Sequence, residues 1–129
     1  MLPAKMSNDA PAELDAFLRA HPDVRFFDAF ISDLNTVERG KRVDRAGVGK
    51  LFESGLLLPG SLFALDILGG TSEATGLGVG DGDADRPCRP IPGTLHPVPW
   101  LQQDGVAQLQ LSMYESDGRP FFGDPRQVL

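Results

Sequence analysis

An alternating stretch near the C-terminal end, AQLQLSM at residues 107–113, restricts the fold more than any other feature of this chain. Apolar side chains occupy positions 107, 109, 111 and 113, and Gln or Ser stands at each position between them. Successive side chains of a β-strand point to opposite faces, so this pattern predicts a strand with one buried and one wet face. With 129 residues, 41% of them hydrophobic, the chain fits one domain around a single core.

Two short helices are predicted ahead of this strand. The first follows the N-cap candidates at residues 7–9, carries Leu14, Phe17 and Leu18 on one face, and ends at His21-Pro22. In the second, Asp44 is the expected cap, residues 48, 51 and 52 form the apolar face, and Gly55 is expected to end the helix in a left-handed conformation. Two internal glycines each cost about 1 kcal/mol relative to alanine, so this helix needs packing against a sheet.

Further strands are predicted around these helices. Residues 24–34 and 37–43 are rich in residues that favour strands, and the polar pair Asn35-Thr36 between them predicts a β-hairpin. Residues 61–68, SLFALDIL, are the next strand candidate. Asp117-Gly118 predicts a turn that brings Phe121-Phe122 back to the sheet. This order of elements predicts an α+β fold.

Composition excludes several classes of function. The formal net charge of −6 argues against binding to nucleic acid or to an anionic membrane, since both recruit Lys and Arg. Cys88 is the single cysteine, so no internal disulfide forms and a reducing compartment is expected. The N-terminal residues lack the apolar core of a signal peptide, and no run approaches the roughly 20 apolar residues of a membrane span. We therefore expect a cytoplasmic protein.

The stretch GLGVGDGDADR at residues 76–86 resembles a ligand loop at first sight. Asp81, Asp83 and Asp85 match the start of a calcium-binding EF-hand loop, but Arg86 and Pro92 stand where that loop needs Gly and Glu. The glycines match neither phosphate-binding pattern, because no helix pattern follows them. Spacing alone favours a solvated acidic loop.

The usual catalytic residue types do not form a recognisable set either. His21 and His96 each precede a proline, and a structural or surface position is favoured for both. Cys88 has arginines nearby at positions 86 and 89, whose positive charge could lower the pKa of its thiol. A lone cysteine is more often a small apolar filler, and this is the favoured interpretation. Trp100 is interpreted as a core or interface anchor. The chain taken alone therefore lacks a complete active site.

Asp66 is the residue that needs a specific explanation. It interrupts the apolar run LFALDIL, where an unpaired buried carboxylate would cost several kcal/mol. It must therefore be paired, stand at a strand end, or face a site. Hydrogen bonds to the amides of Gly69 and Gly70 are the structural alternative to a functional role.

Four stretches together resemble the N-terminal β-grasp domain of the glutamine synthetase family, which includes ligases that join amines to the glutamate side chain. They are FFDAFISDLNTVERGKRV, LFESGLLLPGSLFALDILGG, the acidic loop with CRPIPGTLHPVPW, and GRPFFGDPRQVL. They follow the family's order and span residues 24–129, after an N-terminal helix or extension at residues 1–23. The resemblance implies a β-grasp-like mixed sheet packed by one or two helices, with a long Gly/Asp-rich loop.

The resemblance also implies a division of labour. The family's larger C-terminal domain, which is absent from this chain, carries the ATP site, the Mg or Mn ligands and most of the glutamate site. Family members assemble as double rings, and each active site lies between the C-terminal domain of one subunit and the N-terminal domain of its neighbour. No cofactor or metal ligand is therefore assigned to this chain, which we expect to be inactive alone.

The family's amine-binding aspartate matches Asp66, which would attract the incoming ammonium group and take its proton. Residues 69–86 would form a glycine-rich loop at the subunit boundary, with Gly69 and Gly70 at its start. Asp81, Asp83 and Asp85 would contact cationic groups there. The ALDILGG form resembles the branch that accepts larger amines such as polyamines.

Two other classes stay open from the sequence. The first is a free-standing β-grasp module that binds partners at a sheet edge, because the fold alone says little about function. The second is a calcium-binding domain built on the loop from Asp81 to Asp85.

Overall fold

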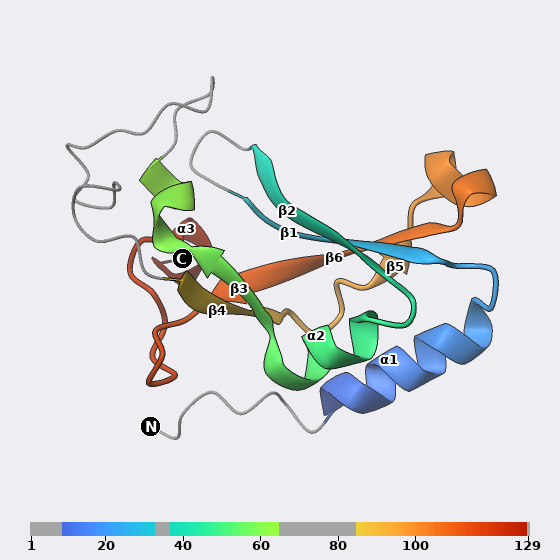
Figure 1. The fold of residues 1–129 in the computed structure, drawn as a ribbon, viewed down its shortest axis with the longest axis horizontal. Helices are drawn as coiled ribbons and strands as arrows, with labels where there is room; N and C mark the ends of the chain where they lie inside the picture. The colour runs from blue at the N-terminus through green and yellow to red at the C-terminus, as the bar shows by residue number, and fades with distance from the viewer. Residues whose placement is uncertain (1–8, 33–36, 65–84, 129) are drawn as a thin grey trace.

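The computed structural model describes residues 9–32, 37–64 and 85–128, which form a mixed sheet with two helices against it (Figure 1). Helix α1 precedes the β1–β2 hairpin, α2 follows it, and strands β3 to β6 complete the sheet. The bounds are α1 Asp9–Ala20, β1 Phe26–Ser32, β2 Glu38–Asp44, α2 Val48–Ser54, β3 Leu56–Pro59, the 3-10 helix η1 Gly60–Ala64, β4 Asp85–Pro90, β5 His96–Pro97, the 3-10 helix η4 Pro99–Asp104, β6 Val106–Met113 and α3 Pro125–Val128.

Strand β6, predicted from the alternating stretch, lies at the centre of the sheet. The strand order is β2-β1-β6-β4-β3, and β5 pairs with the part of β6 that β4 does not reach. Strands β1 and β2 form the predicted antiparallel hairpin, whereas β1 runs parallel to β6. This mixed topology with helices against the sheet is β-grasp-like, as expected.

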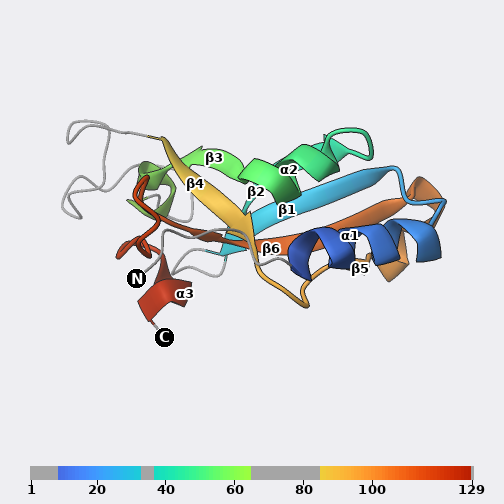
Figure 2. The same cartoon turned by 90° about the horizontal axis from the view of Figure 1, so that it is seen from below.

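Both helices lie on the same side of the sheet (Figure 2). The buried core joins the apolar faces of α1 and α2 to alternate residues of β1 and β6, and it comprises among others Leu14, Phe17, Phe27, Ala29, Ile31, Val48, Leu51, Phe52, Ala107, Leu109, Leu111 and Met113. The in-between residues Gln108 and Gln110 are half-buried on the other face, while Ser112 is buried. Both predicted helices and the clearest predicted strand are confirmed.

The strand expected at residues 61–68 is wrong over its described part. The strand is β3, which ends at Pro59, and residues 60–64 form η1 instead. Strand β3 ends where its partner β4 begins, because Pro59 pairs with Asp85. The turn of η1 then directs Phe63 into the core, so burial by a short helix was mistaken for the burial of a strand. Residues 65–68 lie outside the described part.

Three local expectations need correction. Asp44 does accept a hydrogen bond near the start of α2, but from the amide of Gly47, 2.7 Å away, and Gly47 itself is the N-cap residue. Gly55 has a positive φ of 81°, but its ψ of −179° is extended rather than left-handed helical. Trp100 is 77% exposed on η4, so it is not a core residue of this domain.

Candidate functional site

The predicted site residues fall mostly outside the described residues. Asp85 is the one that the structure describes: it is exposed and begins β4. The others are Asp66, Gly69, Gly70, Asp81 and Asp83, and their predicted roles stay predictions.

The structure does describe the two points at which the predicted loop joins the domain. Pro59, at the end of β3, is the pairing partner of Asp85 in the antiparallel β3–β4 ladder. Helix η1 follows Pro59 directly and ends at Ala64. We call β3, η1, the start of β4 and the side chains that pack against them the frame of the candidate site.

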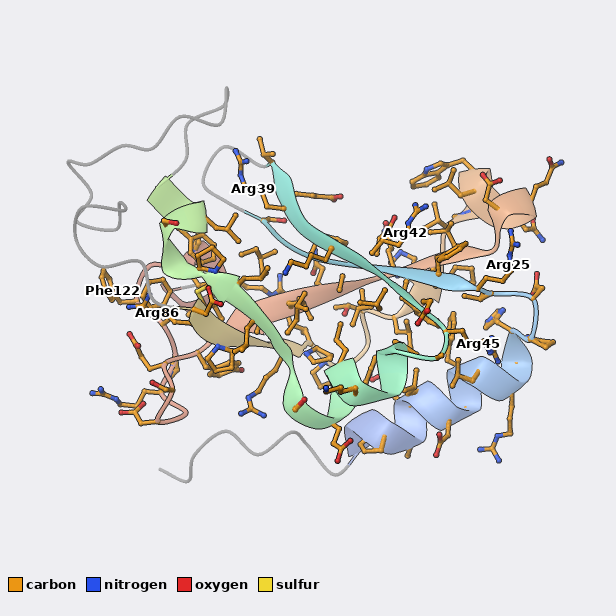
Figure 3. The ribbon with its side chains drawn as sticks, viewed as in Figure 1. Arg25, Arg39, Arg42, Arg45, Arg86 and Phe122 are labelled. Atoms are coloured by element: carbon orange, nitrogen blue, oxygen red, sulfur yellow. The ribbon has the colours of Figure 1, made fainter. Side chains whose placement is uncertain are left out.

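Arg86, the second residue of β4, is the most heavily used side chain of this frame. Its Nε donates to Oε2 of Glu115 at 3.2 Å. Its guanidinium carbon lies 4.3 Å from the ring centroid of Phe121, which is completely buried. The side chains of Arg86 and Glu115 are 22% and 29% exposed, so water screens this ion pair only in part. Figure 3 shows Arg86 and Phe122 together at the η1 end of the molecule.

Helix η1 lies directly against this arginine. A Cβ atom on Gly60 would overlap Nη1 of Arg86 and lie 3.3 Å from the ring of Phe121. The absence of a side chain at position 60 therefore lets the guanidinium approach the backbone of η1. Phe63 of η1 also packs against Phe121, with ring centroids 6.0 Å apart.

The segment that supplies Glu115 and Phe121 is tied to the end of β6. Its predicted turn is confirmed: the amide of Gly118 donates to the carbonyl of Glu115 at 2.9 Å, and Gly118 has a φ of 91°. The amide of Phe121 donates to the carbonyl of Met113 at 3.1 Å, which returns the chain to the sheet without forming a further strand.

Asp124 fixes the same segment from the other end. Its buried carboxylate accepts the amide of Met113 at 2.8 Å and the amide of Arg126 at 3.0 Å. Burial raises the pKa of Asp124, and these two hydrogen bonds oppose that increase. Because Pro125 follows at the first position of α3, the Asp-Pro pair was a helix-start signal that sequence reasoning had not used.

Cys88 is a filler of the core. It is fully buried, and burial together with the negative charge of Asp124 raises its pKa to about 12. The favoured interpretation as an apolar filler is confirmed over the alternative of a reactive thiol, because desolvation of the thiolate is the largest effect on its pKa.

The two histidines occupy structural or surface positions, as favoured. His21 packs against Phe17 with ring centroids 4.4 Å apart. His96 is exposed, and its Nδ1 lies 2.8 Å from the carbonyl of Thr94, so this nitrogen carries the proton. Its Nε2 then accepts from the side-chain amide of Gln108 at 2.9 Å. These contacts join β5 to β6.

The described residues do not include a cluster of metal-binding side chains. Within residues 9–32, 37–64 and 85–128, no group of three His, Cys, Asp or Glu side chains converges on one point. A cavity of about 220 Å³ lies between the α1–β1 turn and η4, and its lining includes His21, Val98 and Val106. None of the described helices has the length and apolar character needed to cross a membrane.

The described residues of this frame do not form a catalytic set. The sequence drew attention to Arg86 as a residue out of place in a calcium loop and as a neighbour of Cys88. Arg86 and Cys88 are two residues apart on β4, so both side chains point to the core-facing side of the strand. A charged side chain on that side indicates that Arg86 has polar or aromatic partners there. Glu115 lies 29 residues away and carried no such signal.

The order of the strands and the two helices against the sheet define a β-grasp-like domain. The chain matches no protein-family model. It is 39% identical over 117 residues, or 91% of its length, to the gamma-glutamylputrescine synthetase PuuA of Escherichia coli (strain K12), and this match covers 24% of that protein. The chain therefore spans about a quarter of the length of this relative.

Solved structures agree with this relationship. An ADP complex of GmaS matches 89% of this chain and 23% of its own chain, with a TM-score of 0.66 and 26% identity. A structure described as a novel glutamine synthase homolog shares the fold, with a TM-score of 0.69 and 21% identity over 82% of this chain and 25% of its own. Together these likenesses support a relationship to the N-terminal domain of the glutamine synthetase family.

Proposed function

We propose that this chain is the N-terminal part of an ATP-dependent ligase that joins an amine to the side-chain carboxyl group of glutamate. The observation that carries the proposal is the 39% identity to a gamma-glutamylputrescine synthetase over 91% of the chain. That relative's name favours a diamine or polyamine over ammonia as the substrate. The match spans 117 of the 129 residues.

In this proposal the domain forms one wall of an active site whose other wall belongs to a neighbouring subunit of a homo-oligomer. ATP, with Mg or Mn, supplies the activation of the glutamate carboxyl group. We assign both to the larger part of the protein, as the family resemblance implies, and among the described residues no group of three His, Cys, Asp or Glu side chains could hold a metal ion. The 129-residue chain alone is then inactive.

Asp66 is the proposed catalytic residue. Its carboxylate attracts the protonated amine into a cleft of low dielectric constant, where the attraction is far stronger than in water. It then accepts a proton from the amine nitrogen, whose freed electron pair forms the new bond to the carbonyl carbon of γ-glutamyl phosphate, while the bond from that carbon to the phosphate oxygen breaks and inorganic phosphate leaves. Gly69 and Gly70 begin the loop at the subunit boundary, and Asp81, Asp83 and Asp85 bind cationic groups of the neighbour or of the amine.

The test uses the natural full-length protein with ATP, glutamate, and either ammonia or putrescine. We expect ligation that favours putrescine, and Asp66→Asn is expected to lower kcat/KM for the amine by about 100-fold or more. Asp15→Asn, on the exposed face of α1, is the matched control and leaves the rate unchanged. Absence of ligation by the wild-type protein would refute the proposed function, and unchanged turnover by Asp66→Asn would assign Asp66 a structural role.

A further inference from the structure

We propose that the cavity between the α1–β1 turn and η4 is a binding site for a small aliphatic amine, whose ammonium end binds the carboxylate of Asp23. At about 220 Å³ the cavity is smaller than the roughly 300–1,000 Å³ of sites for drug-sized ligands, so it suits a short chain of a few heavy atoms. The inference does not depend on the proposed function. The structure describes every residue that carries it, and none of them belongs to the proposed catalytic set.

Aliphatic side chains form much of the cavity wall. Val24, Val98 and Val106 line it, and each is at most 4% exposed. Pro97 and Pro99 complete this part of the lining. These side chains offer no hydrogen-bonding group, so they favour contact with the methylene groups of a ligand. A mostly apolar wall with a few polar groups is typical of sites for small molecules.

Three further lining residues carry polar side chains, namely His21, Asp23 and Gln102. None of these side chains has a hydrogen bond or an ion pair with another residue within 9–32, 37–64 and 85–128. Asp23 supplies the one carboxylate of the described lining, and no lysine or arginine lines the cavity with it. The lining therefore favours a cation over an anion, with the imidazole and the amide as additional hydrogen-bonding groups.

Two arginines of the same region are bound to backbone groups instead of to this carboxylate. Arg45 donates to three carbonyl groups at the end of α1 and in the turn that follows it. Arg25 donates through Nη2 to the carbonyl of Asp104 at 3.2 Å. Because neither arginine is paired with Asp23, its carboxylate is available to a ligand.

The two sides of the cavity meet at Gly105, which lines it. The carbonyl of Gly105 accepts the amides of Arg25 at 2.7 Å and of Phe26 at 3.0 Å. Its φ is 65°, and a Cβ atom at this position would lie 2.6 Å from the carbonyl oxygen of Asp23. Glycine thus lets the end of η4 approach the α1–β1 turn and hold it. A cavity whose sides are fixed in advance loses little conformational freedom when a ligand binds.

Trp100 supports the assignment from the η4 side. It follows the lining residue Pro99 in the chain and is 77% exposed. Figure 1 shows η4, in orange, at the same end of the molecule as the α1–β1 turn. The face of an exposed indole attracts ammonium groups more strongly than any other side-chain ring. A carboxylate, an apolar wall and an exposed indole are together suited to an alkylammonium ligand.

The experiment follows the fluorescence of Trp100 in the 129-residue chain while butylamine, putrescine, butanol or butyrate is added at constant ionic strength. Trp100 is the single tryptophan, so the signal reports on this end of the molecule. Both amines are expected to give a saturable change with a Kd of about 1 mM. Butanol and butyrate keep the aliphatic stem without an ammonium group, and they are expected to bind about fivefold more weakly or worse.

Matched substitutions test the role of the carboxylate. Asp23→Asn keeps the size of the side chain, removes its charge, and is expected to weaken amine binding by about fivefold or more. Asp104→Asn removes an exposed carboxylate of η4 that does not line the cavity, and it is expected to change the Kd by less than about twofold. Asp66→Asn in the same chain is expected to leave the Kd unchanged.

Calorimetry on the full-length protein tests whether the cavity stays open in the whole molecule. The protein carrying Asp66→Asn is titrated with putrescine, with and without the additional change Asp23→Asn. We expect part of the heat of binding to depend on Asp23. If the 129-residue chain does not fold alone, this comparison decides.

The inference is overturned if butanol and butyrate bind as well as the amines, or if Asp23→Asn binds them as tightly as the wild-type chain. It is also overturned if Asp104→Asn weakens binding equally, or if Asp66→Asn abolishes the signal. Full-length protein without heat that depends on Asp23 would mean that the rest of the protein fills the cavity, which overturns it too. Absence of ligation by the wild-type enzyme would refute the proposed function and leave this binding test unaffected.

Discussion

Replacement of Arg45 by alanine is predicted to cost the domain about 2–4 kcal/mol of its free energy of unfolding. Arg45 lies beside the C-terminal end of α1 (Figure 3), where its guanidinium binds backbone carbonyl groups. Nη2 donates to Leu18 at 2.8 Å, and Nη1 donates to His21 at 2.9 Å and to Val24 at 2.8 Å. The last carbonyls of a helix lack partners within the helix, so these bonds satisfy groups that water would otherwise have to reach.

The magnitude follows from these contacts. Each partly buried hydrogen bond contributes about 1 kcal/mol net, and a cation at the negative end of the helix dipole adds about 0.3–1 kcal/mol. The sum is a large fraction of the roughly 5–15 kcal/mol that separates folded from unfolded domains of ordinary stability. Arg45→Lys is expected to recover less than half of the loss, since one ammonium group cannot reach carbonyls that the two guanidinium nitrogens reach together.

Urea unfolding of the 129-residue chain measures this loss, and the midpoint is expected to fall by about 1–2 M. Arg19→Ala is the matched control. Arg19 is an exposed arginine in the last turn of the same helix, and its removal should cost less than about 1 kcal/mol. Equal destabilisation by Arg45→Ala and Arg19→Ala would refute the reasoning, because it would mean that charge near the helix end matters and the three hydrogen bonds do not.

Three further predictions concern the sheet, a buried acid and the thiol. Gly40→Ala should destabilise the chain by roughly 2 kcal/mol or more in the same urea assay, because the new methyl group would lie 2.6 Å from Cα of Phe30 across the hairpin; a change below about 0.5 kcal/mol would contradict this. Burial raises the pKa of Asp124, so its protonated form is favoured in the folded state and its contribution to stability is lost as pH rises through the folded pKa. The stability of the wild-type chain relative to Asp124→Asn should therefore increase as pH is lowered from 7 towards 4, and a difference independent of pH would argue against it. With a pKa of about 12, Cys88 should resist an alkylating reagent at pH 8 in the folded chain and react once urea unfolds it; fast labelling without denaturant would show that the thiol is accessible.

Elements whose pattern is local were predictable from the residues themselves. Strand β6, helix α1 and the β1–β2 hairpin each carry their periodicity within a dozen residues, and each is present where the pattern indicated. The β-grasp-like fold was expected as well, but from the resemblance of whole stretches to a family rather than from periodicity. The predicted roles of Asp66 and of its loop stay predictions, because those residues lie outside the described part.

Short apolar runs were not decided locally. The run that begins at Leu56 contains both β3 and η1, and the boundary lies where β4 stops offering a pairing partner, at Pro59 opposite Asp85. A strand gains its hydrogen bonds from a neighbour that is distant in sequence, so periodicity in one segment cannot report where that neighbour ends.

The same reason explains the contacts of Arg45 and Arg86. The sequence places Arg45 after the hairpin and Arg86 beside an acidic loop. Neither position predicts which group the guanidinium binds. Their contacts join residues 27 and 29 positions apart, from Leu18 to Arg45 and from Arg86 to Glu115. Local patterns reveal which face of an element is apolar, whereas the packing of all elements together determines which charged side chain meets which carbonyl, ring or carboxylate.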